Sequence, residues 1–148
     1  MAWAIKCNDS SCGEITWADN IATLLEKCRN SEGMFVCKTC GKRGYIEKSF
    51  KQQELGETWN PFLLGAIPLW KTEDQAYHPF VFLVSYDPNK EPTDLWFSYF
   101  KDLRGQGGRL KMGYGPGGPP VLDKGHMTKL MRQLLKSNYF TMDQLGDL

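Results

Sequence analysis

Two close pairs of cysteines constrain this chain more than any other feature of its sequence. Cys7 and Cys12 have four residues between them, and Cys37 and Cys40 have two. Two short-spaced pairs joined by a longer spacer are typical of a tetrahedral site in which four thiolates hold one zinc ion. We therefore predict that these four cysteines bind a single structural zinc ion. Iron is the alternative metal, because thiolates accept both ions.

The start of the chain and its hydropathy predict a cytoplasmic protein. The first residues lack the apolar stretch of a signal peptide. The sequence also contains no run of about eighteen apolar residues, so neither a transmembrane helix nor a membrane partner is expected. Thiols stay reduced inside cells, and paired cysteines there favour metal binding over disulfides.

The spacer between the two cysteine pairs has the periodicity of a helix. Asp19 is the predicted N-cap, and apolar residues then recur at i, i+3, i+4 and i+7, at Ile21, Leu24, Leu25 and Cys28. Cys28, the fifth cysteine, is therefore predicted to be a small buried residue of the helix face. A fifth or alternative metal ligand, or a reactive thiol, is the other interpretation.

The second cysteine pair lies between two predicted strands, at residues 34–36 and 45–51. The stretch Phe35-Val36-Cys37-Lys38-Thr39-Cys40-Gly41, followed by Tyr45-Ile46, resembles the second half of a zinc ribbon of the rubredoxin-like group. The resemblance covers residues 3–51. It departs from the commoner pattern in the first knuckle, which has the longer cysteine spacing and is followed by a helix. The resemblance implies a structural metal, in a group whose members often serve nucleic-acid machinery but also include enzymes and electron carriers.

The rest of the chain predicts a small antiparallel sheet and a C-terminal helix. Residues 80–86 and 95–100 are β-branched and aromatic and predict a core hairpin. Residues 63–70 predict an edge strand, because Pro68 cannot donate to a central ladder. Asp123 is the predicted N-cap of an amphipathic helix with the apolar positions Met127, Leu130, Met131, Leu134 and Leu135. The expected fold class is α+β, with a zinc-ribbon-like module at 1–53 and the sheet-and-helix part at 54–148.

Basic residues are concentrated near the C-terminus. Residues 101–136 carry 8 basic and 2 acidic side chains, whereas residues 54–94 carry 2 basic and 7 acidic ones. Residues 105–120 contain seven glycines and three prolines and predict an exposed loop. An anionic partner, DNA or RNA, is therefore expected at this loop and the final helix, with the candidate contacts Arg109, Lys111, Lys129 and Arg132.

No catalytic residue is predicted. His78 and His126 are interpreted as surface residues, and the Cys37–Cys40 pair lacks the βαβ setting of a redox motif. The leading hypothesis is a non-catalytic zinc-binding protein associated with nucleic acid. One alternative is a protein–protein adaptor whose ribbon and acidic middle segment face another protein, and a third is a small-molecule enzyme.

Overall fold

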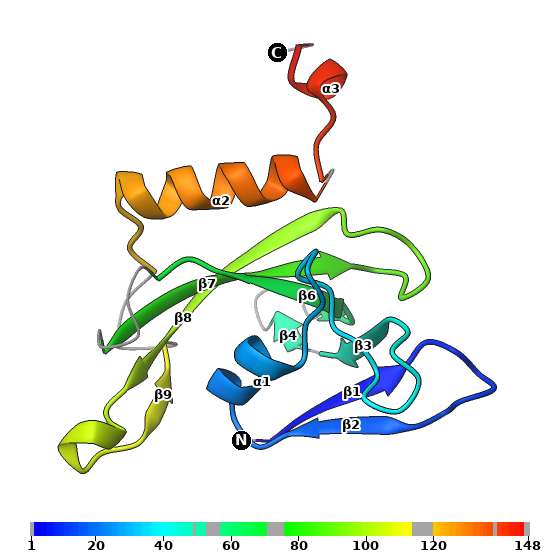
Figure 1. The fold of residues 1–148 in the computed structure, drawn as a ribbon, viewed down its shortest axis with the longest axis horizontal. Helices are drawn as coiled ribbons and strands as arrows, with labels where there is room; N and C mark the ends of the chain where they lie inside the picture. The colour runs from blue at the N-terminus through cyan, green and yellow to red at the C-terminus, as the bar shows by residue number, and fades with distance from the viewer. Residues whose placement is uncertain are drawn as a thin grey trace. The chain divides into compact units, whose positions relative to one another are not determined.

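The computed structural model describes residues 2–48, 50–52, 57–70, 76–113, 120–137 and 139–146. The main feature of these residues is a seven-stranded antiparallel sheet (Figure 1). Its strands, in order across the sheet, are β2 (Ile15–Ala18), β1 (Trp3–Cys7), β3 (Gly44–Glu47), β6 (Phe62–Pro68), β7 (Tyr77–Ser85), β8 (Asp94–Asp102) and β9 (Leu110–Met112). A separate two-stranded pair joins β4 (Phe50–Gln52) to β5 (Glu57–Trp59). The helical elements are α1 (Ile21–Lys27), the 3-10 turn η1 (Arg104–Gln106), α2 (Lys124–Lys136) and the short α3 (Met142–Gly146).

The predicted α+β fold class, in which an N-terminal module continues into a small antiparallel sheet, is wrong, although the helix expected between the cysteine pairs is present as α1. Strands from the cysteine-bearing segment and strands from the rest of the chain belong to one sheet, and helix makes up only 22% of the structure. The junction is β3, which pairs with β1 on one side and with β6 on the other. A short ribbon strand has unpaired backbone groups along its outer edge, and pairing with β6 satisfies them.

The chain clusters into two compact units, which we call unit 1 and unit 2. Unit 1 comprises Met1–Ala66 and Phe82–Trp96, and unit 2 comprises Ile67–Val81 and Phe97–Leu148. The predicted domain boundary after residue 53 falls at residues 53–56, which lie outside the described residues. The division into domains 1–53 and 54–148 therefore stays a prediction.

In unit 1, β1 and β2 form an antiparallel hairpin with Trp3 paired to Ala18 and Lys6 to Ile15. Trp3 and Ile5 point into the core, with Ile5 fully buried, because successive side chains of a strand alternate between its faces. Trp3 also packs against Phe82, with ring centroids 5.8 Å apart.

The helix α1 confirms the predicted apolar face but begins one residue later than expected. Its N-cap is Asn20, not Asp19, and the Asn20 side chain accepts a hydrogen bond from the Thr23 backbone N–H. Ile21, Leu24 and Leu25 are buried. Cys28 is the C-cap and is also buried, as predicted.

The expected strand at residues 34–36 is a series of isolated bridges instead. Phe35 pairs with Arg29, Met34 with Gly65, and Val36 with Arg43. The backbone passes very close to β6 at this point, where Ala66 N–H donates to the Gly33 carbonyl at 2.9 Å. The residues that lead into Cys37 therefore lie beside β6, a strand in the interior of the sheet.

The prediction that residues 63–70 form an edge strand is wrong. β6 lies between β3 and β7 in the sheet, and its residues 63–67 are buried. Pro68 is compatible with this position because it is the last residue of the strand, where the ladder ends. Leu69 N–H then donates to the Pro79 carbonyl at 2.9 Å.

In unit 2, aromatic rings form the core around the predicted hairpin, which β7 and β8 confirm. His78 is buried, contrary to the expected surface position, and stacks on Phe100 with the ring centroids 4.5 Å apart. Trp70 meets both rings edge-on, at 5.0 Å and 5.7 Å.

His126 is part of the N-terminal capping box of α2, together with the predicted N-cap Asp123. Of the Gly-rich segment, residues 114–119 lie outside the described residues.

The close approach at Gly65 gives a test of the fold. A Cβ added to Gly65 would lie 2.4 Å from the Gly33 carbonyl oxygen and 2.9 Å from Met34 Cα. Because both are backbone atoms, no side-chain rotation relieves the clash. Gly65→Ala is therefore expected to lower the free energy of unfolding by about 1–3 kcal/mol, measured by urea denaturation.

The matched control is Gly105→Ala, whose added Cβ would meet nothing within 4 Å. That variant should stay within about 0.5 kcal/mol of the parent protein. Equal effects of the two substitutions would contradict the described path of residues 33–34 beside β6.

Candidate metal centre

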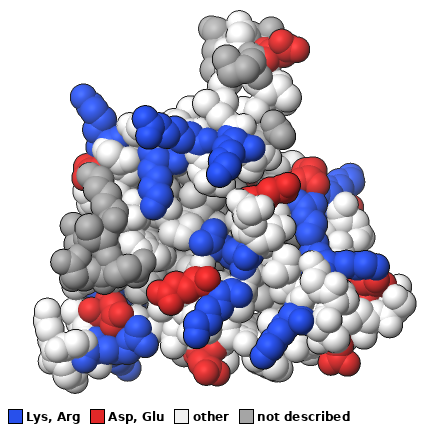
Figure 2. All heavy atoms as spheres, viewed as in Figure 1, with Lys and Arg blue, Asp and Glu red and all other residues white. Residues whose placement is uncertain are grey.

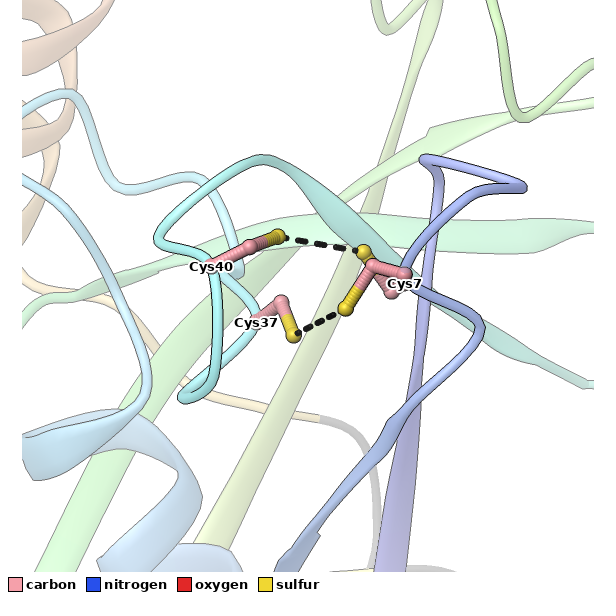
Figure 3. A group of neighbouring side chains, drawn as sticks. Cys7, Cys37 and Cys40 are labelled. Carbon is pink, nitrogen blue, oxygen red and sulfur yellow. Dashed lines mark hydrogen bonds between the residues drawn. The ribbon is translucent and has the colours of Figure 1, made fainter.

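The four paired cysteines converge on one point. The sulfur atoms of Cys7, Cys12, Cys37 and Cys40 all lie within 4.8 Å of one another. Cys7 Sγ is 3.5 Å from Cys40 Sγ (Figure 3). Cys12 Sγ is 3.8 Å from Cys37 Sγ, so each contact joins one pair to the other. Sulfurs bound at about 2.3 Å to one tetrahedral ion lie roughly 3.8 Å apart. The cluster is therefore compatible with a metal site, and this arrangement can form a zinc-ribbon-like knuckle.

The first knuckle is the turn between β1 and β2, and Asp9 organises it. The Asp9 carbonyl accepts hydrogen bonds from the N–H groups of Cys12, at 3.0 Å, and Gly13, at 3.1 Å. Its carboxylate accepts from the Ser11 backbone N–H and hydroxyl. Gly13 has a φ of +65°, a left-handed conformation that glycine adopts without strain. These bonds hold Cys12 back toward Cys7.

The second knuckle is a tight turn closed by the backbone. Cys37 N–H donates to the Lys42 carbonyl at 2.8 Å, and Gly41 N–H donates to the Cys37 carbonyl at 2.9 Å. Thr16 adds a side-chain contact, because its hydroxyl accepts from the Lys38 N–H at 2.8 Å. The turn therefore aims Cys37 and Cys40 at the first knuckle.

Backbone N–H groups point at three of the sulfurs and favour their thiolate forms. N–H groups of Cys40 and Thr39 lower the pKa of the Cys37 thiol to about 6, against its burial. The Asp9 N–H acts to lower the pKa of Cys7, but burial and the three neighbouring thiols raise it to about 12. Ionising all four thiols would place four negative charges in this small volume, and a bound cation removes the resulting repulsion.

Salt bridges and loop contacts connect the two knuckles to each other and to the β7–β8 loop. Lys42 Nζ lies 2.5 Å from the Asp9 carboxylate, which joins the second knuckle to the first and lowers the pKa of Asp9. Arg43 binds Glu91 through two hydrogen bonds of 2.6 and 3.0 Å. The Asn8 side chain donates to the Pro88 carbonyl at 3.3 Å.

Sequence reasoning did not find these supporting residues. The Asp9-Ser10-Ser11 stretch could have predicted the turn, because the aspartate side chain often accepts a hydrogen bond from the backbone N–H two residues later. No sequence pattern predicts the Arg43–Glu91 ion pair, because the two residues are far apart in the chain and each has many alternative partners. Cys28 is not among the four converging cysteines. Its lack of a ligand role stays a prediction.

The four predicted nucleic-acid contacts fall into two groups in unit 2. Arg109 and Lys111 belong to the β8–β9 hairpin, where Lys111 pairs directly with Lys101, a residue that sequence reasoning overlooked. Lys129 and Arg132 line a hollow of about 460 Å³ on α2. The ammonium of Lys129 also donates to the Trp70 carbonyl at 2.9 Å, so this lysine has a structural contact.

No protein-family model, curated protein or solved structure matches the chain. In the part of the chain that the structure describes, no helix has both the length and the apolar character needed to cross a membrane.

The contacts of Asp9 predict that it supports metal binding without contacting the metal. Asp9→Ala removes the bonds to Ser11 and Lys42, and residues that orient metal ligands typically contribute about 10–100-fold to metal affinity. We expect Asp9→Ala to lose metal to a competing chelator at a correspondingly lower chelator concentration. Asp19→Ala, which changes an exposed aspartate outside both knuckles, should behave like the parent protein. Unchanged metal affinity in Asp9→Ala would contradict this role.

Proposed function

We propose that this chain is a non-catalytic binding protein in which one zinc ion, held by Cys7, Cys12, Cys37 and Cys40, stabilises the fold of the knuckles. The observation that carries the proposal is the convergence of the four sulfurs within 4.8 Å. Four thiolates complete the tetrahedral shell of zinc and leave no coordination position for an activated water. A metal in this site therefore supplies folding energy and performs no catalysis.

Zinc is the proposed ion because the cluster provides thiolates only. Iron fits the same donors, and elemental analysis of protein made under reducing conditions distinguishes the two. We expect one zinc per chain.

Cys40→Ser is expected to lose the zinc and to unfold the knuckles, because the metal-binding energy is part of the folding energy. The matched control is Cys28→Ala, which removes a buried cysteine outside the cluster. It should keep one zinc and lose only about 1 kcal/mol of stability. Protein without metal, or reduced zinc in Cys28→Ala, would contradict the proposed ligand set.

We further propose that unit 2 binds nucleic acid through its basic side chains. The β8–β9 hairpin supports this, because like charges directly opposite each other, as in Lys101 and Lys111, destabilise a sheet unless an anion neutralises them. The acidic residues of this region have other contacts: Asp102 pairs with Arg104, and Asp123 caps α2. Figure 2 shows lysine and arginine side chains gathered over α2.

The variants that test this interaction are chosen from basic residues whose side chains have no structural contact described above. Lys129 is left intact, because its bond to the Trp70 carbonyl would confound the result. The test variant is Arg109→Ala/Lys111→Ala/Arg132→Ala. The control variant, Lys27→Ala/Lys38→Ala/Lys90→Ala, removes the same charge from exposed positions of unit 1.

About four phosphate contacts predict a log–log salt slope near −3.6 on duplex DNA, and loss of three contacts flattens it by about 2.7. Fluorescence anisotropy from about 50 mM salt upward measures this slope. The control variant should keep the parent slope, and zinc content should stay the same in both. No binding to DNA or RNA at the lowest salt would reject the nucleic-acid proposal and leave the zinc proposal standing.

A further inference from the structure

The side chains of α2 form four rows at i, i+4 spacing, each with a different environment. The row of His126, Leu130 and Leu134 faces inward, and the two leucines are 2% and 1% exposed. This row attaches the helix to unit 2. The row that contains Lys129 also contacts unit 2, through the hydrogen bond to the Trp70 carbonyl. The remaining two rows are exposed, and their chemistry determines what the outer surface of α2 can bind.

The neighbouring row is apolar and exposed. Met127, Met131 and Leu135 retain 41%, 40% and 39% of their accessible surface. They follow one another at i, i+4 and i+8, so they form one ridge along more than two turns of the helix. We call these three residues the apolar ridge. Neither the zinc site nor a phosphate contact requires it.

A basic row borders the apolar ridge on its other side. It consists of Lys124, Thr128, Arg132 and Lys136, all exposed. The sequence of α2 contains four basic residues and no acidic one. A partner of the apolar ridge therefore needs apolar side chains next to negative charge.

We propose that the apolar ridge of α2 is a docking site for an amphipathic α-helix of another protein, with acidic residues beside its apolar stripe. A ridge of i, i+4 side chains is the surface that packs into the groove of a second helix. Methionine suits such a contact, because its flexible, polarisable side chain adapts to the partner's shape. The acidic residues of the partner lie against Arg132 and Lys136.

The same features disfavour two other occupants. A second copy of the chain docking through its own α2 brings two basic, acid-free rows together, which like-charge repulsion opposes. A lipid surface needs a broad apolar face, but the most apolar row of this helix, with Leu130 and Leu134, is already buried in unit 2. The ridge matches the narrower stripe of a partner helix.

The direct test uses a labelled peptide of about 18 residues, long enough to form a helix, with leucines at i, i+4 spacing and glutamates in the adjacent row. Anisotropy titration with the full, metal-loaded chain is expected to show saturable binding. Met127→Gln/Met131→Gln should weaken it by about tenfold or more, because the substitutions make the centre of the contact polar. Val121→Gln, which changes an apolar residue 70% exposed outside α2, is the control and should leave binding unchanged.

Reversing the charges on both α2 and the peptide distinguishes a lost contact from a loss of protein stability. Arg132→Glu/Lys136→Glu should lose affinity for the glutamate peptide and gain affinity for the same peptide with lysine in place of glutamate. Absence of peptide binding, or peptide binding that the methionine substitutions leave unchanged, would overturn the proposal. Binding only to phosphatidylglycerol vesicles, or only to nucleic acid, would also overturn it.

Discussion

The convergence of four sulfur atoms is the constraint on which the N-terminal architecture depends. Each knuckle is a local turn, but the two meet only because β1 pairs with β3, with Cys7 opposite Gly44. Gly44 permits this pairing, since a Cβ at that position would lie 2.5 Å from Ile5 Cγ2 and 2.8 Å from the Lys6 carbonyl oxygen. The geometry of the thiol cluster is therefore fixed by a close strand contact as much as by the cysteines.

The supporting contacts extend this constraint beyond the cysteines. Asp9 and Lys42 join the two knuckles, and Arg43 and Glu91 connect them to the loop between β7 and β8. Each ion pair is exposed on at least one side, so its individual energy is small. Their contribution lies mainly in orienting the turns that carry the four cysteines, as residues around metal sites usually do for the ligands.

The sequence predicted those features that depend on neighbours in the chain. The knuckle spacing, the apolar face of α1, the helix α2 with its Asp123 cap and the β7–β8 hairpin all follow from local periodicity and turn chemistry, and the structure contains them. Of the five apolar positions predicted for α2, only Leu130 and Leu134 are buried. The wrong predictions concern long-range pairing. Nothing near Pro68 reveals that β6 lies inside the sheet, and nothing near His78 reveals its stacking on Phe100. The union of both parts in one sheet depends on the pairing of β3 with β6, which local patterns do not encode.

The strand order also has a consequence for how the protein is made. From β3 onward, the strands of the main sheet follow one another across it in chain order, with only the separate β4–β5 pair set aside. Domains form progressively as a chain leaves the ribosome, N-terminal part first. All four cysteines emerge by residue 40, long before Glu91, so the residues of the thiol cluster are all synthesised before most of the sheet. The order β3-β6-β7-β8-β9 across the sheet therefore matches the order in which these strands are synthesised, so each new strand can pair with one that already exists.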